Sequence, residues 1–141
     1  MSDRDDYATN ALPRRLDDIV RRQRDRCQIR LASAAEFDAL HTALPAARAR
    51  HTLADWRLIA IVADGNASLH LLGTTERTES WITSRVSGLD LETRSARTAN
   101  NHYALAAAGA GEPPFEHVLH VCAALNAWGL GRALDVVRVF Y

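Results

Sequence analysis

The stretch that decides the fold is residues 56–72, which read Trp-Arg-Leu-Ile-Ala-Ile-Val at 56–62, Ala-Asp-Gly-Asn at 63–66 and Ala-Ser-Leu-His-Leu-Leu at 67–72. Two dense apolar runs flank a short polar segment whose Asp, Gly and Asn residues tolerate positive φ angles. This arrangement predicts two strands joined by a tight antiparallel turn.

The residues that follow this hairpin continue as short extended segments. Residues 80–89 mix apolar and polar positions in a way that predicts a third strand. Residues 94–98 and 102–106 predict a further hairpin about Asn100-Asn101, because asparagine adopts left-handed turn geometry easily. Residues 56–106 therefore predict a meander of about five antiparallel strands.

Helical spacing dominates the chain on both sides of the meander. A first helix is predicted over about 14–28, where one narrow stripe holds Leu16, Ile19, Val20, Gln23 and Cys27. A second, over 34–44, begins at Ser33 and Glu36, which have the spacing of a capping box. A third, over 114–128, ends at Gly129.

Two segments complete the sequence-based fold. Residues 46–52 fit either a short helical turn or a loop, and the β-branched residues of 133–141 predict a final strand. The expected fold class is α+β, a single domain over 13–141 behind a flexible acidic N-terminus at 1–12. It has two N-terminal helices, an antiparallel sheet of five or six strands that is either open or curled into a small, partly open barrel, and one C-terminal helix packed on it.

The composition excludes several functional classes. All 17 basic residues are arginine and they balance 17 acidic residues, so neither Schiff-base lysine chemistry nor a phosphate-loop lysine is available. A neutral chain is not built to coat nucleic acid or an anionic membrane. Cys27 and Cys122 form no paired motif, and the first thirty residues hold no apolar signal segment, so we expect a cytoplasmic, soluble protein.

The meander also carries a pattern of short motifs. These are Trp-Ile-Thr-Ser-Arg-Val at 81–86, Leu-Asp at 89–90, Ala-Arg-Thr at 96–98 and Tyr-Ala-Leu at 103–105. Together they resemble small, mostly uncharacterised β-meander proteins of proteobacterial accessory genomes, such as phages, plasmids and integrative elements. The resemblance covers about a third of the chain and transfers no catalytic residue. It implies a protein that acts by binding.

Two histidines are the strongest candidates for chemistry. His117 and His120 lie three residues apart on the third predicted helix and could share a metal ion. A third ligand would have to come from His41, His51, His70 or His102, and no spacing rule selects one. We therefore expect no cofactor, and a metal-dependent enzyme remains only an alternative.

The expected function is a non-catalytic module that binds another protein or itself, with a homodimer as one form. The expected contact residues are Trp81, Arg85, Arg97 and Tyr103 on the meander and Arg15, Arg22 and Arg26 on the first helix. The alternative is a nucleic-acid-binding regulator, because arginines outnumber acids along the first helix and guanidinium groups suit phosphate contact.

Overall fold

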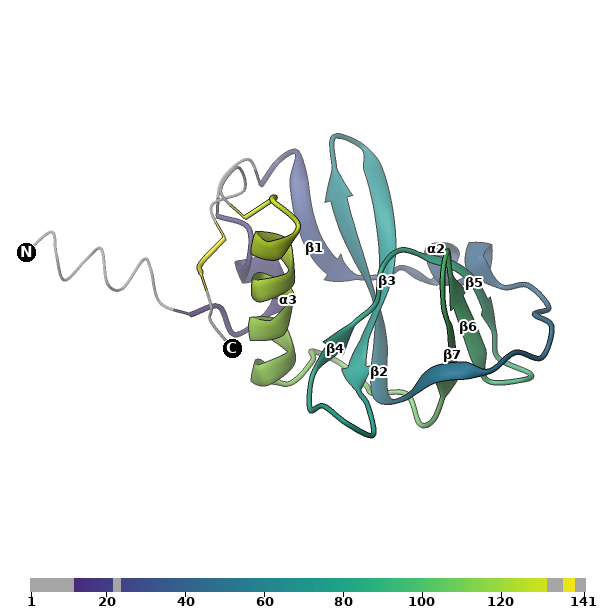
Figure 1. Ribbon diagram of the computed structural model, residues 1–141. Helices are drawn as coiled ribbons and strands as arrows, with labels where there is room; N and C mark the ends of the chain where they lie inside the picture. Colours follow the sequence, from purple (N-terminus) through teal and green to yellow (C-terminus); the bar gives the residue numbers. More distant parts are fainter. Residues whose placement is uncertain (1–11, 22–23, 132–135, 139–141) are drawn as a thin grey trace, which may run out of the picture.

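A seven-stranded sheet with two α-helices forms the framework of the protein. The computed structural model describes residues 12–21, 24–131 and 136–138 (Figure 1). In chain order the elements are η1 (a 3-10 turn, Leu16–Asp18), β1 (Cys27–Leu31), α2 (Ala34–Leu40), β2 (Ala49–Ala63), β3 (Asn66–Thr74), β4 (Trp81–Ile82), β5 (Val86–Asp90), β6 (Ser95–Thr98), β7 (His102–Leu105) and α3 (Phe115–Ala127).

The β2–β3 hairpin confirms the prediction made from residues 56–72. Asp64 and Gly65 both have positive φ angles, of 51° and 83°, which is the geometry of a two-residue turn matched to strand twist. The pairing runs from Ala63 opposite Asn66 to Arg57 opposite Leu72. Strand β2 starts at Ala49, so part of the segment left open between turn and loop is extended.

The sheet is mixed, and the prediction of an antiparallel sheet was wrong. The β6–β7 hairpin about Asn100 and Asn101 forms as expected, but β7 then pairs in parallel with the first half of β2. His51 lies opposite Tyr103, and Leu53 lies opposite Leu105. This pairing joins segments about fifty residues apart, so no local sequence pattern indicates it.

The predicted first helix over 14–28 was also wrong. Among the described residues of this segment only η1 is helical, and Cys27–Leu31 form β1, which pairs antiparallel with the second half of β2. Cys27 and Ile29 are buried while Gln28 is exposed, which is the alternation of a half-buried strand. The part of the chain described before the meander thus has one α-helix, α2, instead of two.

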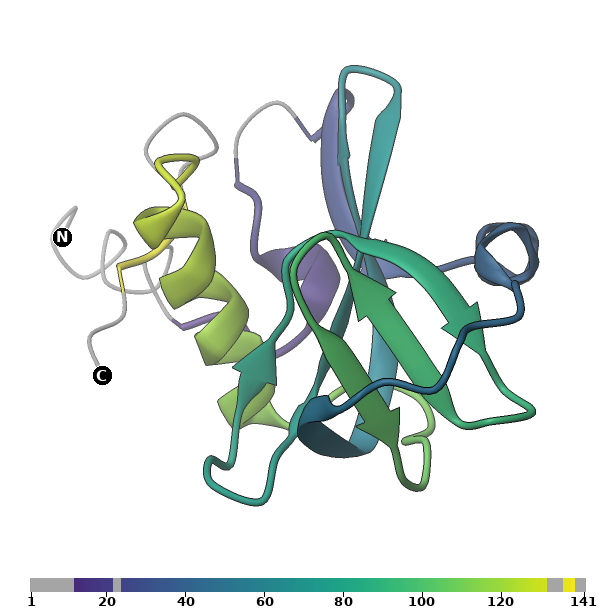
Figure 2. The ribbon, with the colours of Figure 1, turned by 45° about the vertical axis from the view of Figure 1, so that its right-hand side comes forward.

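The predicted third strand over 80–89 is split in two. Strand β4 pairs with β3, whereas β5 pairs with β6, and Thr83 lies between them. The backbone N–H of Thr83 donates to Leu71 O, and its hydroxyl accepts from Leu71 N–H at 3.0 Å. Since β4 and β5 stand at opposite ends of the strand order, this short link makes the sheet curl back on itself (Figure 2).

The curled sheet separates two apolar clusters. The inner cluster lies within the curl and includes Leu53, Trp56, Leu58, Leu71, Leu89 and Tyr103. The outer cluster lies between the sheet and the α3–η1 layer and includes Ile29, Ile59, Leu72, Val118, Val121 and Leu125. Strand β2 contributes to both because its side chains alternate between the two faces from Leu58 to Ile61. A bulge at Asp55, with φ of 50°, shifts this alternation by one residue, so that Leu53 and Trp56 both belong to the inner cluster.

The two α-helices form as predicted, although α2 is shorter. Ser33 and Glu36 make the expected capping box, and α3 covers 115–127 of the predicted 114–128. Residues 136–138 are not in a strand, and the rest of the predicted strand over 133–141 lies outside the described residues, as do residues 1–11 of the N-terminus and Arg22.

Candidate functional site

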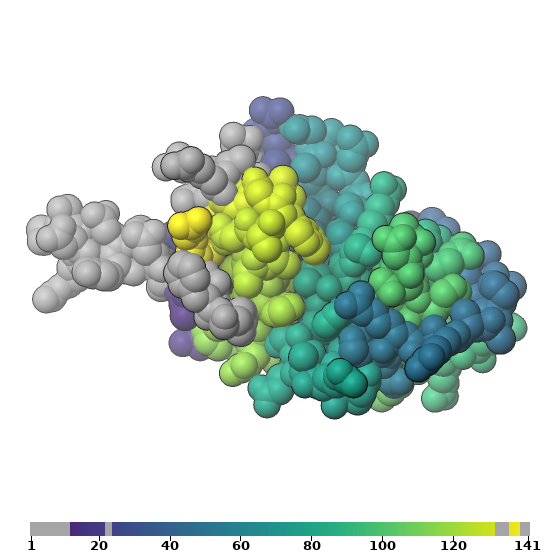
Figure 3. All heavy atoms as spheres, in the orientation of Figure 1, coloured from purple at the N-terminus to yellow at the C-terminus, as the bar shows by residue number. Residues whose placement is uncertain are grey.

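A polar hollow of about 370 Å³ lies where the start of β2 meets the β6–β7 turn. It is lined by Arg48, Ala49, Arg50, Asn100, Asn101 and His102, and we call it the arginine hollow. The register explains the meeting, because Ala49 lies directly opposite His102 in the parallel pair. In Figure 3 the blue spheres of the first segment lie beside the green spheres of the second, on a part of the sheet that α3 does not cover.

Arg50 is held in place by contacts with Trp81 and Asn101. Its guanidinium carbon lies 4.9 Å from the centre of the Trp81 ring, within the range of a cation–π interaction. In the amide orientation that satisfies both of its polar atoms, Asn101 Oδ1 accepts from Arg50 Nη1 at 3.2 Å. A guanidinium oriented in this way loses less side-chain entropy when it binds a ligand.

His51 and Glu76 form a polar pair next to this group. His51 Nδ1 and Glu76 Oε1 are 2.7 Å apart, and Glu76 Oε2 accepts from the backbone N–H of Thr52 at 3.0 Å. These hydrogen bonds, the one with His51 above all, lower the pKa of Glu76 to about 2. The His51 ring meets the Trp81 ring edge-on with centroids 4.5 Å apart, so Arg50 and His51 both contact the same tryptophan.

The arginines of the hollow, like several exposed arginines elsewhere, differ in charge balance from the arginines that form ion pairs. Arg30 pairs with Glu36 at 2.7 Å, Arg26 with Asp64 at 2.6 Å, and the buried Arg57 with Asp55 at 3.3 Å. Within the described ranges, no carboxylate forms an ion pair with Arg48 or Arg50. The hollow is therefore a place of uncompensated positive charge on a neutral chain.

The contact residues expected on the meander do not form one surface. Tyr103 is 2% exposed and belongs to the inner cluster, whereas Trp81 is half-buried under Arg50. Arg85 is exposed, and Arg97 Nε lies 3.4 Å from Ser87 Oγ on the neighbouring strand. The structure brings Trp81 into contact with Arg50 of the hollow and places Arg97 opposite His102 in the register.

The arginines expected on the first helix are placed differently because that helix is absent. Arg15 lies 3.7 Å from both Asp17 and Glu112, and Arg26 is bound to Asp64 in the β2–β3 turn. Arg22 lies outside the described residues. Over the described residues of 14–28, the helical arginine face on which the nucleic-acid hypothesis depended is absent.

The histidine pair on α3 lies in protein contacts, although the buried Nδ1 of His117 has no hydrogen-bond partner among the residues that the structure describes. His117 is 3% exposed, and its Nε2 lies 2.8 Å from Glu79 O and 3.2 Å from Thr74 Oγ1. His120 is partly buried, and burial together with the neighbouring His117 lowers its pKa. In the part of the chain that the structure describes, no three His, Cys, Asp or Glu side chains are grouped so that they could hold a metal ion.

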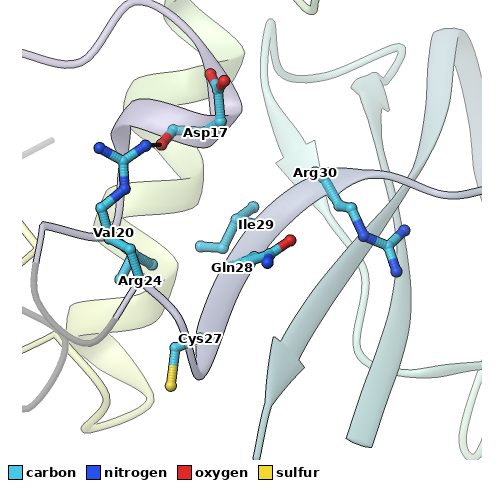
Figure 4. Close-up of a pocket in the computed structure, with 7 residues that line it drawn as sticks. All are labelled: Asp17, Val20, Arg24, Cys27, Gln28, Ile29 and Arg30. Atoms are coloured by element: carbon cyan, nitrogen blue, oxygen red, sulfur yellow. Dashed lines mark hydrogen bonds between the residues drawn. The ribbon is translucent and has the colours of Figure 1, made fainter. Parts of the chain in front are cut away.

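Two smaller hollows have structural explanations. One, of about 170 Å³, lies between η1 and the outer edge of β1, and Arg24 closes it by donating to Asp17 O (Figure 4). Here η1 and Arg24 lie over the free edge of β1, where another chain could otherwise add a strand. The other, of about 260 Å³, is an apolar groove beside Phe37 and Trp56. Its polar groups are already bonded, since Trp56 Nε1 donates to Ala106 O and Arg57 to backbone carbonyls.

Sequence reasoning missed most of the hollow. Asn100 and Asn101 were interpreted as a turn alone, His102 only as a spare metal ligand, and Arg48 and Arg50 received no role. The available signal was the Arg-Ala-Arg spacing at 48–50, which puts two guanidinium groups on one side of an extended segment.

Comparison with known proteins adds no family to this description. No protein-family model, curated protein or solved structure matches the chain. Among the described residues, no helix is long and apolar enough to cross a membrane.

Proposed function

We propose that the protein is a non-catalytic, cytoplasmic binding module that recognises an acidic segment of another protein through the arginine hollow. The observation that carries the proposal is the pair Arg48 and Arg50, which line a polar hollow without a carboxylate partner among the described residues. A carboxylate from a partner would supply the missing counter-charge. The resemblance of the meander to small, mostly uncharacterised β-meander proteins of accessory genomes, which implies a protein that acts by binding, agrees with this role.

The chemistry of the lining favours carboxylates. Guanidinium groups bind carboxylates through two parallel hydrogen bonds, which gives geometric selectivity as well as affinity. The side chains of Asn100 and Asn101 add amide donors and acceptors that suit the backbone of an extended peptide. A volume of about 370 Å³ leaves room for more than one acidic side chain.

An acidic protein segment fits this site better than a nucleic acid. Proteins that bind single strands usually present aromatic rings on which bases stack. Here the Trp81 ring is already packed against Arg50 and His51, and Tyr103 is in the core. The chain is also neutral overall, so it lacks the broad positive field that tracks a phosphate backbone.

The test is fluorescence anisotropy with a labelled glutamate-rich peptide, compared with the same peptide carrying glutamines. The protein should bind only the glutamate peptide. The R48Q/R50Q variant should bind it at least tenfold more weakly, since hydrogen bonds to charged groups are worth about 1.5–3 kcal/mol. The matched control is R85Q/R94Q, which removes the same charge from exposed arginines outside the hollow.

Two results would overturn the proposal. Equal weakening in both double variants would mean that only net charge matters. Tighter binding of a single-stranded oligonucleotide, with a steep dependence on salt, would instead support the nucleic-acid alternative.

A further inference from the structure

His102 is the member of the arginine hollow whose charge can change near neutral pH. It is half-buried at the start of β7 and lines the hollow together with Arg48 and Arg50. Histidine is the side chain that ordinarily changes its charge between about pH 5 and 8. The charge of the hollow can therefore vary in the range where acidic side chains of a partner stay ionised.

The groups that face His102 are positive or neutral. From β6, Arg97 lies opposite it in the register, and from the β2 side the hollow is lined by Arg48 and Arg50. The nearby Glu76 is already bound to His51 and to the backbone of Thr52. No carboxylate of the described residues is hydrogen-bonded to or ion-paired with His102.

We propose that an acidic segment entering the arginine hollow is bound together with a proton on His102, an inference that rests on the function proposed above. Among the described residues His102 has no carboxylate partner, and a bound carboxylate favours a charged imidazole. Binding of the acidic segment therefore promotes proton uptake by His102. By linkage, the proton must strengthen ligand binding by the same factor.

The expected consequence is tighter binding at acidic pH. Screened by water, one added positive charge some 5 Å from a carboxylate strengthens binding about fourfold. Affinity for the glutamate peptide should rise by this factor between about pH 8 and pH 5.5, because glutamate side chains remain ionised over that range.

Isothermal titration calorimetry of the full chain with the glutamate peptide tests the coupling directly. Titrations near pH 6.5, in two phosphate-free buffers of different ionisation enthalpy, give the number of protons taken up on binding. The wild type should take up a substantial fraction of a proton, and H102Q should take up close to none. H41Q is the control, because His41 is exposed beside β5 and outside the hollow.

The outcomes separate this inference from the proposed function. Proton uptake by H102Q equal to that of the wild type, or peptide binding by the wild type without uptake, would overturn the role of His102 alone. Failure of the peptide to bind at any pH would overturn both proposals. If H102Q is unfolded, the shift of the His102 imidazole NMR signal on adding peptide to the wild type decides the question.

Discussion

Arg57 offers the sharpest test of the contact between the β2–β3 hairpin and the segment that follows β7. Its side chain is 8% exposed and donates to the backbone carbonyls of Asp55 at 3.1 Å, Ala110 at 2.8 Å and Gly111 at 2.8 Å. The substitution R57M keeps the apolar stem and removes the guanidinium. The carbonyls of Ala110 and Gly111 are in exposed residues and can bond to water instead. Each lost bond then costs about 1 kcal/mol, and the free energy of unfolding should fall by about 3 kcal/mol.

Urea unfolding followed by tryptophan fluorescence measures this loss, because Trp56 is the neighbouring residue. R85M is the control and should stay within about 0.5 kcal/mol of the wild type, since Arg85 is exposed. A loss below about 1 kcal/mol in R57M would refute the reasoning, because it would mean that the three hydrogen bonds contribute nothing beyond solvation.

A second variant, at Gly109, tests the same packing of the Arg57 guanidinium against the segment after β7. A Cβ at position 109 would overlap Arg57 Nη1 and Asp55 Oδ1, so G109A should displace the guanidinium and destabilise the fold. The combined variant R57M/G109A should lose less than the sum of the two single losses, by about 1 kcal/mol or more. Strict additivity would show that glycine is required at 109 for a different reason.

Other predictions concern the cap, the core and the pH dependence of stability. S33A removes one half of the capping box of α2 and should cost about 1 kcal/mol in urea unfolding, with A35G as a comparison for helix propensity alone. L71A in the inner cluster should cost about 2–5 kcal/mol, because Leu71 is fully buried, and a smaller loss would indicate that the curl collapses around the cavity. Burial lowers the pKa of His70, so the folded state binds fewer protons than the unfolded chain, and the free energy of unfolding should fall as the pH drops below about 6.5; H70Q should flatten this slope. Hydrogen bonds from Arg30 and from the Ser33 backbone hold the pKa of Glu36 at about 2, so this carboxylate stabilises the fold above about pH 4.5 and loses its effect as the pH falls towards 2; R30Q should make acid unfolding begin at a higher pH.

The features that the sequence predicted correctly are those with local causes. The Asp64-Gly65 turn, the Asn100-Asn101 hairpin and the capping box at Ser33 all depend on residues within a few positions of one another. The β1 strand was missed because Cys27 lies eleven residues after Leu16, a spacing of about three helical turns. One residue thus fitted both periods, and pairing with β2 selected the extended one.

The candidate site could not be assembled from the sequence for a different reason. Arg48 and Arg50 precede the long apolar run, whereas His102 follows the second hairpin some fifty residues later. Only the parallel pairing of β2 with β7 brings them together. Parallel pairs need long connections and leave no turn signal at the point of contact, so a meander of antiparallel hairpins was the natural expectation.

Strand β2 is shared by the two apolar clusters, so neither cluster can unfold alone. Because β2 passes Leu58 to one cluster and Ile59 to the other, loosening either one withdraws the strand that the second requires. Backbone amides from Leu58 to Ile61 should therefore exchange with solvent deuterium only through global unfolding, and they should be among the slowest in the chain. On heating, the α3–η1 layer and the curled sheet should unfold in one cooperative transition.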